Sequence, residues 1–284
     1  VPEGPSRTLS PIEVLAERIR TKLRCPVCLT DSLRQERLDL ICGECGANFP
    51  IRRGIVDFVA ERDGSGGFAQ GVMELPFYAR WYEFFRPSLT LLISSRSLRE
   101  EYALSTRLLD LSSDSDLLDV GCGTGNFTRT FARHLRARDS TKTNIITGLD
   151  LSWPMLNEAR ERSFREDLEK QIQYVRGDAL NLPFRDERFD RLHCAGSLHL
   201  MESIQTVLAE FRRVLVPGGT LVLGTFLLGD GTLRPLVKRL GGWLTQFHWF
   251  GENELHERLR GEGFIVDEFS VAGDAVTVQA TLRS

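Results

Sequence analysis

Short apolar runs, separated by amphipathic or polar segments, follow one another through the second half of the chain. Each run of this length predicts a buried strand, and the longer amphipathic segments predict helices. The expected elements are a strand from Leu117, a helix over Thr128–Arg138, strands over Asn144–Leu149, from Tyr174 and from Phe189, and a helix, turn and fifth strand over Glu210–Leu223.

The carboxyl-terminal segment has a different pattern. Glu252–Gly261 predicts a helix, and Gly261 and Gly263 are suited to ending it. Phe264–Val271 and Ala275–Leu282 then predict two strands joined by a short turn. We therefore expect a closing antiparallel hairpin at the end of the chain.

A glycine-rich turn follows the strand from Leu117. Glycines alternate at 121, 123 and 125, so a ligand can approach the main chain there without meeting Cβ atoms. The next helix offers unpaired N–H groups at its start. The dinucleotide fingerprint needs a third glycine where this chain has Asn126, which disfavours a nicotinamide cofactor. Asp150 ends the second strand, where an acid can accept hydrogen bonds from ribose hydroxyls.

Asp119 and the three glycines, followed by Asp150, Asp178 and the Pro217-Gly218-Gly219 unit, resemble the motifs of class I methyltransferases that use S-adenosylmethionine. The resemblance covers roughly residues 100 to 284. It implies an α/β fold, a Rossmann-like doubly wound sheet with an antiparallel carboxyl-terminal hairpin. It also implies the cofactor S-adenosyl-L-methionine, bound by Asp119, Gly121, Gly123, Gly125, Asp150, Leu151, Met155, Asp178, Ala179 and Cys194.

Two Cys-x-x-Cys knuckles near the amino terminus indicate a metal site. Cys25 and Cys28 form the first, and Cys42 and Cys45 form the second after 13 intervening residues. Four sulfurs at this spacing can close a tetrahedron around Zn²⁺, which predicts a zinc ribbon and a structural metal site. Iron bound by the same thiolates remains an alternative. Leu33–Ile41 has strand character, and Ile51–Phe58 is expected to be the closing strand of the ribbon.

Composition fits one large and one small domain. The chain has 284 residues, 42% hydrophobic residues and a net charge of −3. We expect a helix and zinc ribbon over residues 1–62, a glycine-rich linker over 63–71, and the methyltransferase domain over 72–284. No apolar run approaches the roughly 20 residues of a membrane span, and the first ten residues are polar, so we expect a cytoplasmic protein without a membrane span.

Two segments are expected to cover the predicted cofactor site as helical lids, residues 72–100 and 226–251. The first is crowded with aromatic residues at helical spacing, which also fits a helix packed on the sheet. The resemblance implies that such lids carry substrate choice, and an aromatic lid favours an apolar or ring-bearing substrate. The expected substrate-binding residues are Tyr78, Trp81, Tyr82, Phe226 and Trp249.

Two histidines are candidates for the base that a hydroxyl or activated carbon acceptor needs. His199 falls just past the fourth strand, beside the expected methyl position, and His248 lies on the second lid. The usual role of a lone histidine at such a position is a hydrogen-bonded wall residue, and this alternative stays open for both. His193 is expected to point into the sheet, and His256 to lie on a solvated helix face.

The order of the knuckles, Leu75–Pro87, Leu182–Phe184 and His193–Leu200 along the chain also resembles that of bacterial and plant-chloroplast methyltransferase-like proteins of unassigned substrate. We therefore predict a SAM-dependent enzyme that methylates the oxygen or carbon of a small apolar or aromatic acceptor, such as a natural product or quinone. One alternative is a base methyltransferase of rRNA or tRNA whose zinc module contacts RNA. Residues up to Arg62 hold ten Lys and Arg against nine Asp and Glu, which disfavours nucleic acid as a partner. The other alternative is a non-catalytic SAM-binding partner protein. The oligomeric state is left open.

Overall fold

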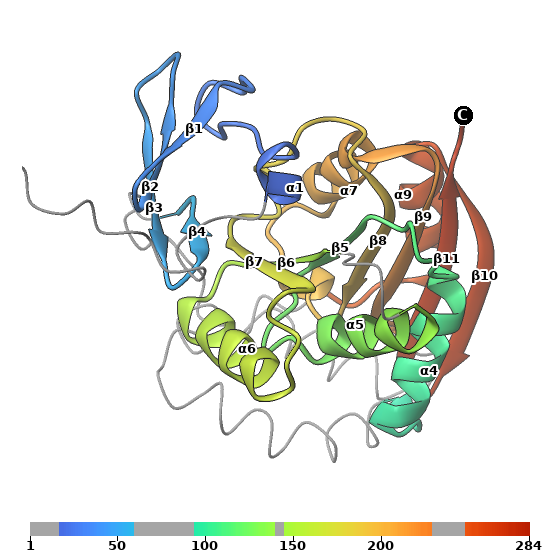
Figure 1. Cartoon of the computed structure of the whole chain (residues 1–284). Helices are drawn as coiled ribbons and strands as arrows, with labels where there is room; N and C mark the ends of the chain where they lie inside the picture. The colour runs from blue at the N-terminus through green and yellow to red at the C-terminus, as the bar shows by residue number, and fades with distance from the viewer. Residues whose placement is uncertain (1–16, 60–93, 140–144, 229–247) are drawn as a thin grey trace, which may run out of the picture.

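The computed structural model describes residues 17–59, 94–139, 145–228 and 248–284, which form an eleven-stranded sheet with helices on both faces (Figure 1). The strand order is β1-β2-β3-β4-β7-β6-β5-β8-β9-β11-β10. The strands are β1 Leu33–Glu36, β2 Asp39–Cys42, β3 Asn48–Arg52, β4 Ile55–Asp57, β5 Leu117–Val120, β6 Ile146–Asp150, β7 Ile172–Arg176, β8 Phe189–Ala195, β9 Leu215–Phe226, β10 Phe264–Ala272 and β11 Ala275–Leu282. The helices are α1 Glu17–Arg20, α4 Leu98–Leu109, α5 Asn126–Arg138, α6 Trp153–Arg165, α7 Ile204–Val214 and α9 Glu252–Gly261, with a 3₁₀ turn at Leu198–Leu200.

The centre of the sheet is parallel and its carboxyl-terminal side is antiparallel. Strands β4, β7, β6, β5, β8 and β9 run in one direction, each hydrogen-bonded to the next. Strand β11 pairs antiparallel with β9, and β10 pairs antiparallel with β11. The predicted Rossmann-like α/β sheet and its closing hairpin are therefore confirmed, and α9 has the predicted bounds.

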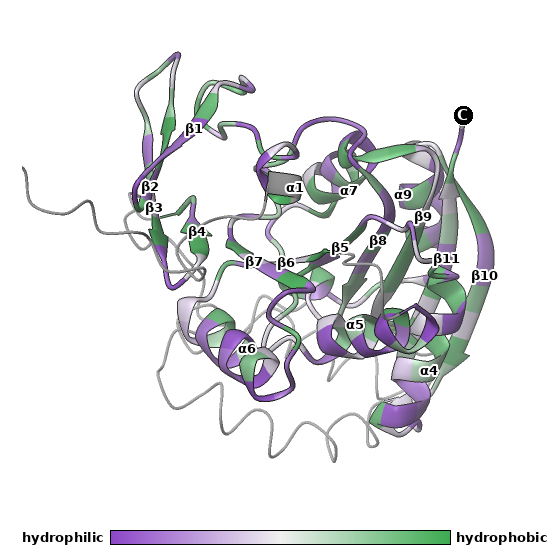
Figure 2. Ribbon diagram, viewed as in Figure 1, coloured by the Kyte–Doolittle hydropathy of each residue, from purple (hydrophilic) through white to green (hydrophobic). Residues whose placement is uncertain are grey.

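Two apolar layers sandwich the sheet. Phe131 of α5 and Leu156 of α6 pack with Leu117, while Phe211 of α7 and Leu255 of α9 belong to the opposite layer with Leu118. Figure 2 shows apolar residues concentrated in the central strands and polar residues on the outer surfaces of the helices. Because successive residues of a strand face opposite sides, the run of buried residues along β5 supplies both layers.

The strand expected over Ile51–Phe58 is instead two strands, and this expectation was wrong. Arg53 and Gly54 have φ values of 53° and 76°, which is the backbone of a tight hairpin turn, so the chain reverses between β3 and β4. Strand β4 then pairs parallel with β7, Val56 opposite Val175 and Asp57 opposite Arg176. Strands β1–β4, which follow the first cysteine knuckle, thus share one hydrogen-bonded sheet with the Rossmann-like strands.

Several predicted segments lie outside the described residues. They are the linker 63–71, the lid segment 72–93 and residues 229–247 of the second lid. The predicted domain division after residue 62 therefore stays a prediction. Among the residues that the structure describes, no helix is both long and apolar enough to cross a bilayer.

Candidate functional site

The glycine turn connects β5 to α5 and has left-handed backbone at Gly121, Gly123 and Gly125, with φ values of 66°, 54° and 73°. A Cβ at Gly121 would lie 2.2 Å from Ser197 Oγ, and a Cβ at Gly125 would lie 2.5 Å from the Tyr174 hydroxyl. A Cβ at Gly123 would meet nothing within 4 Å among the described residues. Packing therefore requires two of the glycines, whereas Gly123 faces open space where a ligand can approach the main chain.

Asp150, at the end of β6, holds this turn. Its Oδ2 accepts a hydrogen bond of 2.8 Å from the Gly123 N–H, and its Oδ1 accepts one of 2.8 Å from the Ser152 N–H. The carboxylate thus bridges the glycine turn and the start of α6, where Ser152 accepts from the Met155 N–H. A half-buried anion bound to main-chain N–H groups is an acceptor already oriented for ribose hydroxyls.

Asp178 lies beside Asp150 because their strands are adjacent. The Gly177 N–H donates to the Asp150 carbonyl at 3.1 Å, which joins the ends of β6 and β7. Asp178 then begins a four-residue turn: the Asn181 N–H donates to its carbonyl at 3.1 Å, and its Oδ1 accepts from the Leu180 N–H at 2.9 Å. The structure therefore brings together Asp150, predicted to accept from a ribose, and Asp178, which the resemblance implies as a second cofactor-binding acid.

Asp119 lies in a different position from the other predicted acids. Its side chain is 2% exposed and bonds to the Thr128 hydroxyl and to His193 Nδ1, the latter at 2.8 Å. The rings of Phe127 and Phe131 pack against His193. Asp119 thus joins the end of β5 to the first turn of α5 and to β8, and the His193 ring packs against α5.

The remaining predicted cofactor residues line the same strand ends. Met155 is 4% exposed and Ala179 is 8% exposed, while Leu151 is half-buried. Cys194 Sγ lies 3.3 Å from Ser197 Oγ, next to the glycine turn. Burial raises the pKa of the Cys194 thiol to about 12, so the thiol is protonated at neutral pH. Such a thiol acts as wall and not as nucleophile.

An aromatic cluster stands at the ends of β8 and β9. The His199 ring meets Phe226 edge-on at 4.6 Å between centroids, and Phe226 lies 6.1 Å from Trp249. The His248 N–H donates to the His199 carbonyl at 2.8 Å, which ties the segment before α9 to the 3₁₀ turn. Three predicted residues, one catalytic and two substrate-binding, are therefore neighbours. Tyr78, Trp81 and Tyr82 lie outside the described residues.

The two candidate bases have different surroundings. His199 is 4% exposed, and burial lowers its pKa to about 3, so its imidazole is neutral at physiological pH. His248 Nε2 lies 3.1 Å from Glu254 Oε1, in the first turn of α9. A carboxylate partner of this kind orients an imidazole.

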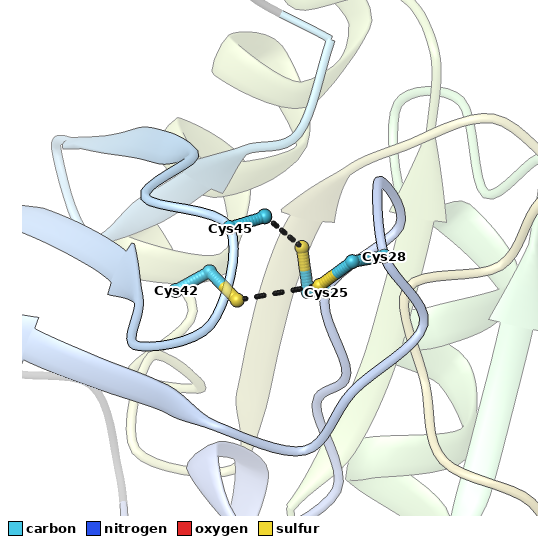
Figure 3. A group of neighbouring side chains, drawn as sticks. All are labelled: Cys25, Cys28, Cys42 and Cys45. Carbon is cyan, nitrogen blue, oxygen red and sulfur yellow. Dashed lines mark hydrogen bonds between the residues drawn. The ribbon is translucent and has the colours of Figure 1, made fainter.

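The four knuckle cysteines converge in space (Figure 3). Cys25 and Cys45 have their Sγ atoms 3.7 Å apart, Cys28 and Cys42 have theirs 3.5 Å apart, and all four sulfurs lie within 4.8 Å of one another. Sulfurs at about 2.3 Å from Zn²⁺ in a tetrahedron are about 3.8 Å apart, so the donor set fits this ion. Such a four-sulfur site leaves no position for substrate.

Several supporting residues had no clear signal in the sequence. Ser197 meets Gly121, and Arg176 joins β7 to β4 through Asp57. These contacts depend on how distant strands pair. Thr128 is the exception, since a hydroxyl in the first turn of the helix after the glycines is placed to reach the acid that precedes them.

Residues 118–223 match the model of the methyltransferase domain family. The matched span begins in β5 and ends in β9, so it contains the glycine turn, Asp150 and Asp178. The family match therefore falls on the strands that carry the candidate site.

Two relatives and one solved structure extend this match. The chain is 35% identical over 121 residues to 27-O-demethylrifamycin SV methyltransferase of Amycolatopsis mediterranei, covering 43% of this chain and 42% of that protein. It is 26% identical over 260 residues to an uncharacterized chloroplastic methyltransferase of Arabidopsis thaliana, covering 82% and 70%. Phosphoethanolamine N-methyltransferase 2 of Haemonchus contortus, solved with phosphomonomethylethanolamine and S-adenosylhomocysteine, has a TM-score of 0.61 at 17% identity, covering 76% of this chain and 59% of that one.

Because the identity to the solved structure is low, this similarity shows only that the fold is shared. The chain spans about half the length of most of the curated relatives that it matches. Taken with the family model, these matches support a class I SAM-dependent methyltransferase.

Proposed function

We propose that this protein transfers a methyl group from S-adenosylmethionine to the oxygen or carbon of a small apolar or aromatic acceptor. One observation carries the proposal: the Asp150 carboxylate is fixed by the Gly123 N–H at the point where Gly123 faces open space. In open parallel sheets, ligands bind outside the carboxyl ends of the strands. A bare main chain and an oriented acid at that position suit an adenosyl ligand.

In this proposal different residues around the strand ends bind different parts of the cofactor. Asp150 accepts from the ribose hydroxyls, Asp178 and the Ala179 N–H meet the adenine ring, and the glycine turn surrounds the methionine part. Leu151, Met155 and Cys194 supply apolar wall. Asp119 and His193, bonded to each other, fix the end of β5 from which the turn begins. The sulfonium of the bound cofactor supplies an already activated methyl group, so the protein has mainly to align the acceptor and exclude water.

The acceptor is proposed to lie against the aromatic cluster of His199, Phe226 and Trp249. Aromatic walls favour planar or apolar ligands through their large contact area. His199 is neutral, so its imidazole can hydrogen-bond an acceptor hydroxyl without placing a second cation beside the sulfonium. His248, oriented by Glu254, is the second candidate to remove a proton. The relative that methylates a demethylated rifamycin is consistent with an acceptor of this kind.

The four-cysteine site is proposed to hold one structural Zn²⁺. The sulfur spacing and the donor set fit a tetrahedral soft cation. Binding of the metal would supply folding free energy to strands β1–β3, which have few apolar residues of their own. Metal analysis of the purified protein should find about one zinc per chain, and a fully folded, metal-free protein would contradict the assignment.

A labelled-methyl assay tests the catalytic proposal. Calorimetry first establishes whether S-adenosylmethionine and S-adenosylhomocysteine bind. The protein is then incubated with methyl-labelled cofactor and either total RNA or a lipid-soluble metabolite extract. We expect label in the metabolite fraction; label in RNA would support a base methyltransferase instead. Binding without transfer to either would support a non-catalytic SAM-binding protein.

A further inference from the structure

A four-residue turn lies between the cysteine site and the proposed adenine site. Asp178 is its first residue and Asn181 its last, and Asn181 N–H closes the turn on the Asp178 carbonyl. The Asn181 side chain points the other way: its Nδ2 donates to the Pro26 carbonyl at 2.9 Å. Because Pro26 lies between Cys25 and Cys28, one short turn joins the first cysteine knuckle to the predicted adenine acceptor.

The chain on either side of this contact is also paired. The Arg24 N–H donates to the Pro183 carbonyl at 3.1 Å, and the Arg185 N–H donates to the Lys22 carbonyl at 2.8 Å. Between them Leu23 and Phe184 form an antiparallel bridge, and both side chains are 0% exposed. The segment that enters the first knuckle and the segment that leaves the turn are therefore held as one unit.

Arg185 strengthens this unit from the side. Its Nε donates to the Leu23 carbonyl at 3.0 Å, and its Nη2 donates to the Asp31 carbonyl at 3.1 Å. These acceptors lie before and after the first knuckle. A single guanidinium thus fixes the knuckle relative to the segment that leaves the Asp178–Asn181 turn.

A second connection reaches the ribose acid. Arg176 Nη1 lies 3.3 and 3.2 Å from the two carboxylate oxygens of Asp57, which is fully buried at the end of β4. The same guanidinium donates through Nε to the Leu151 carbonyl at 2.9 Å, directly after Asp150. The loops after Asp150 and Asp178 are therefore both bonded to residues 17–59, the first through Arg176 and Asp57 and the second through Asn181.

We infer that metal occupancy of the four-cysteine site sets the affinity for the adenosyl cofactor, with Asn181 as the positioning residue that couples the two sites. The inference rests on the proposed function. A tetrahedral cation fixes the first knuckle against the second, and this fixes the Pro26 carbonyl on which the Asp178 turn is docked. Without the cation, the first knuckle is no longer fixed against the second, so the Pro26 carbonyl and the turn docked on it can shift together, and the proposed adenine acceptor loses its orientation.

Coupling of this kind is reciprocal, which gives two independent measurements. Removing the metal should weaken binding of S-adenosylhomocysteine, and saturating S-adenosylhomocysteine should tighten metal binding by the same factor. We expect a factor of about 5 to 20, which lies within the usual range for coupled sites. Calorimetry gives the first quantity, and competition with a chromophoric zinc chelator gives the second.

Asn181→Ala separates coupling from folding. The variant keeps all four cysteines and the Asp178 side chain, so it should bind zinc and unfold cooperatively as the wild type does. Its zinc-loaded form should bind S-adenosylhomocysteine about 5- to 20-fold more weakly, and the ligand should no longer tighten zinc binding. Asn48→Ala, which removes an exposed amide on β3 of the same module, is the matched control and should leave both affinities unchanged.

The outcomes distinguish this inference from the proposed function. If the zinc-loaded wild type binds no S-adenosylhomocysteine, both are overturned. If it binds with the same affinity with and without zinc, or if Asn181→Ala matches the wild type at full zinc loading, only the coupling is overturned. The comparison at full loading applies even where the metal-free protein is unfolded.

Discussion

His193 Nδ1 lies 2.8 Å from Asp119 Oδ1, and both side chains, from β8 and β5, are almost fully buried. A buried carboxylate that loses a hydrogen-bond donor keeps its desolvation cost without compensation. We therefore expect His193→Leu to lower the free energy of unfolding by about 1–3 kcal/mol. Urea unfolding followed by circular dichroism measures the change, with His256→Leu on the half-buried face of α9 as the control. Wild-type stability in His193→Leu would contradict the supporting role.

The three glycines of the turn should respond differently to a methyl group. Gly121→Ala places a Cβ 2.2 Å from Ser197 Oγ in a left-handed backbone, so this variant should be strongly destabilised. Gly123→Ala meets no described atom within 4 Å and should lose only the roughly 1–2 kcal/mol of left-handed strain. It should nevertheless bind S-adenosylhomocysteine poorly, because its methyl group occupies the space left for the ligand.

Thermal unfolding and calorimetry together test this contrast. Gly196→Ala provides a control, since Gly196 also has a positive φ and, among the described residues, no neighbour within 4 Å of its Cβ position. Equal loss of stability in the Ala variants at 121 and 196 would refute the Ser197 clash. If Gly123→Ala bound S-adenosylhomocysteine with full affinity, the proposed position of the ligand beside the turn would be wrong.

Asp150→Ala should weaken binding of S-adenosylmethionine and S-adenosylhomocysteine by about 1–3 kcal/mol, because it removes the charged acceptor proposed for the ribose. The same change also releases the Gly123 and Ser152 N–H groups, so unfolding must be measured beside binding. Glu158→Ala, on the partly exposed surface of α6, is a control of equal charge change. Unchanged ligand affinity in Asp150→Ala would remove this acid from the site.

The buried His199 predicts a pH dependence of stability. Its pKa is about 3 in the folded protein, against about 6.5 for an exposed histidine, so between these values the unfolded chain binds a proton that the folded chain does not. Its contribution to stability is therefore complete above pH 6.5 and falls as the pH decreases, by up to about 1.4 kcal/mol per unit. His199→Gln should flatten this part of the profile in urea titrations at pH 7, 6 and 5. A variant profile parallel to that of the wild type would be inconsistent with burial of this imidazole.

Removal of the proposed metal should unfold strands β1–β3. Cys28→Ser deletes one of the four sulfur ligands, and we expect no stoichiometric zinc and a lower melting temperature in this variant. Cys122→Ser replaces a cysteine of the glycine turn that lies outside the cluster, so it should retain the zinc. Zinc content measured by mass spectrometry, together with the melting curve, distinguishes the two. Retention of a full zinc complement by Cys28→Ser would show that the metal is held differently.

Local patterns in the sequence predicted the order of strands and helices well. Alternating glycines, an acid at a strand end and paired knuckles are each contained within a few residues, so sequence patterns were sufficient to identify Asp150 and the four cysteines as candidates. Asp178 was a candidate only through the family resemblance. The ends of α9 followed from the same kind of signal, a periodic segment bounded by glycine.

Contacts between distant segments were not predictable in this way. The two-strand course of residues 51–58 depends on a left-handed residue at Arg53, where sequence alone favours continued extension. The pairing of β4 with β7 and the docking of Asn181 on Pro26 join positions 119 and 155 residues apart. A single amino-acid sequence does not show which distant segments come into contact, because many alternative pairings bury similar apolar surface.

Strand β4 also protects the rest of the molecule. In its absence, β7 would present a row of unpaired main-chain groups at the border of a strongly apolar sheet, which is a template for intermolecular β-pairing. A truncated protein that begins after residue 93 would therefore be prone to aggregation, whether or not it still binds a ligand. Residues 17–59 therefore cannot be removed without exposing an edge of the parallel sheet, since β4 pairs with β7.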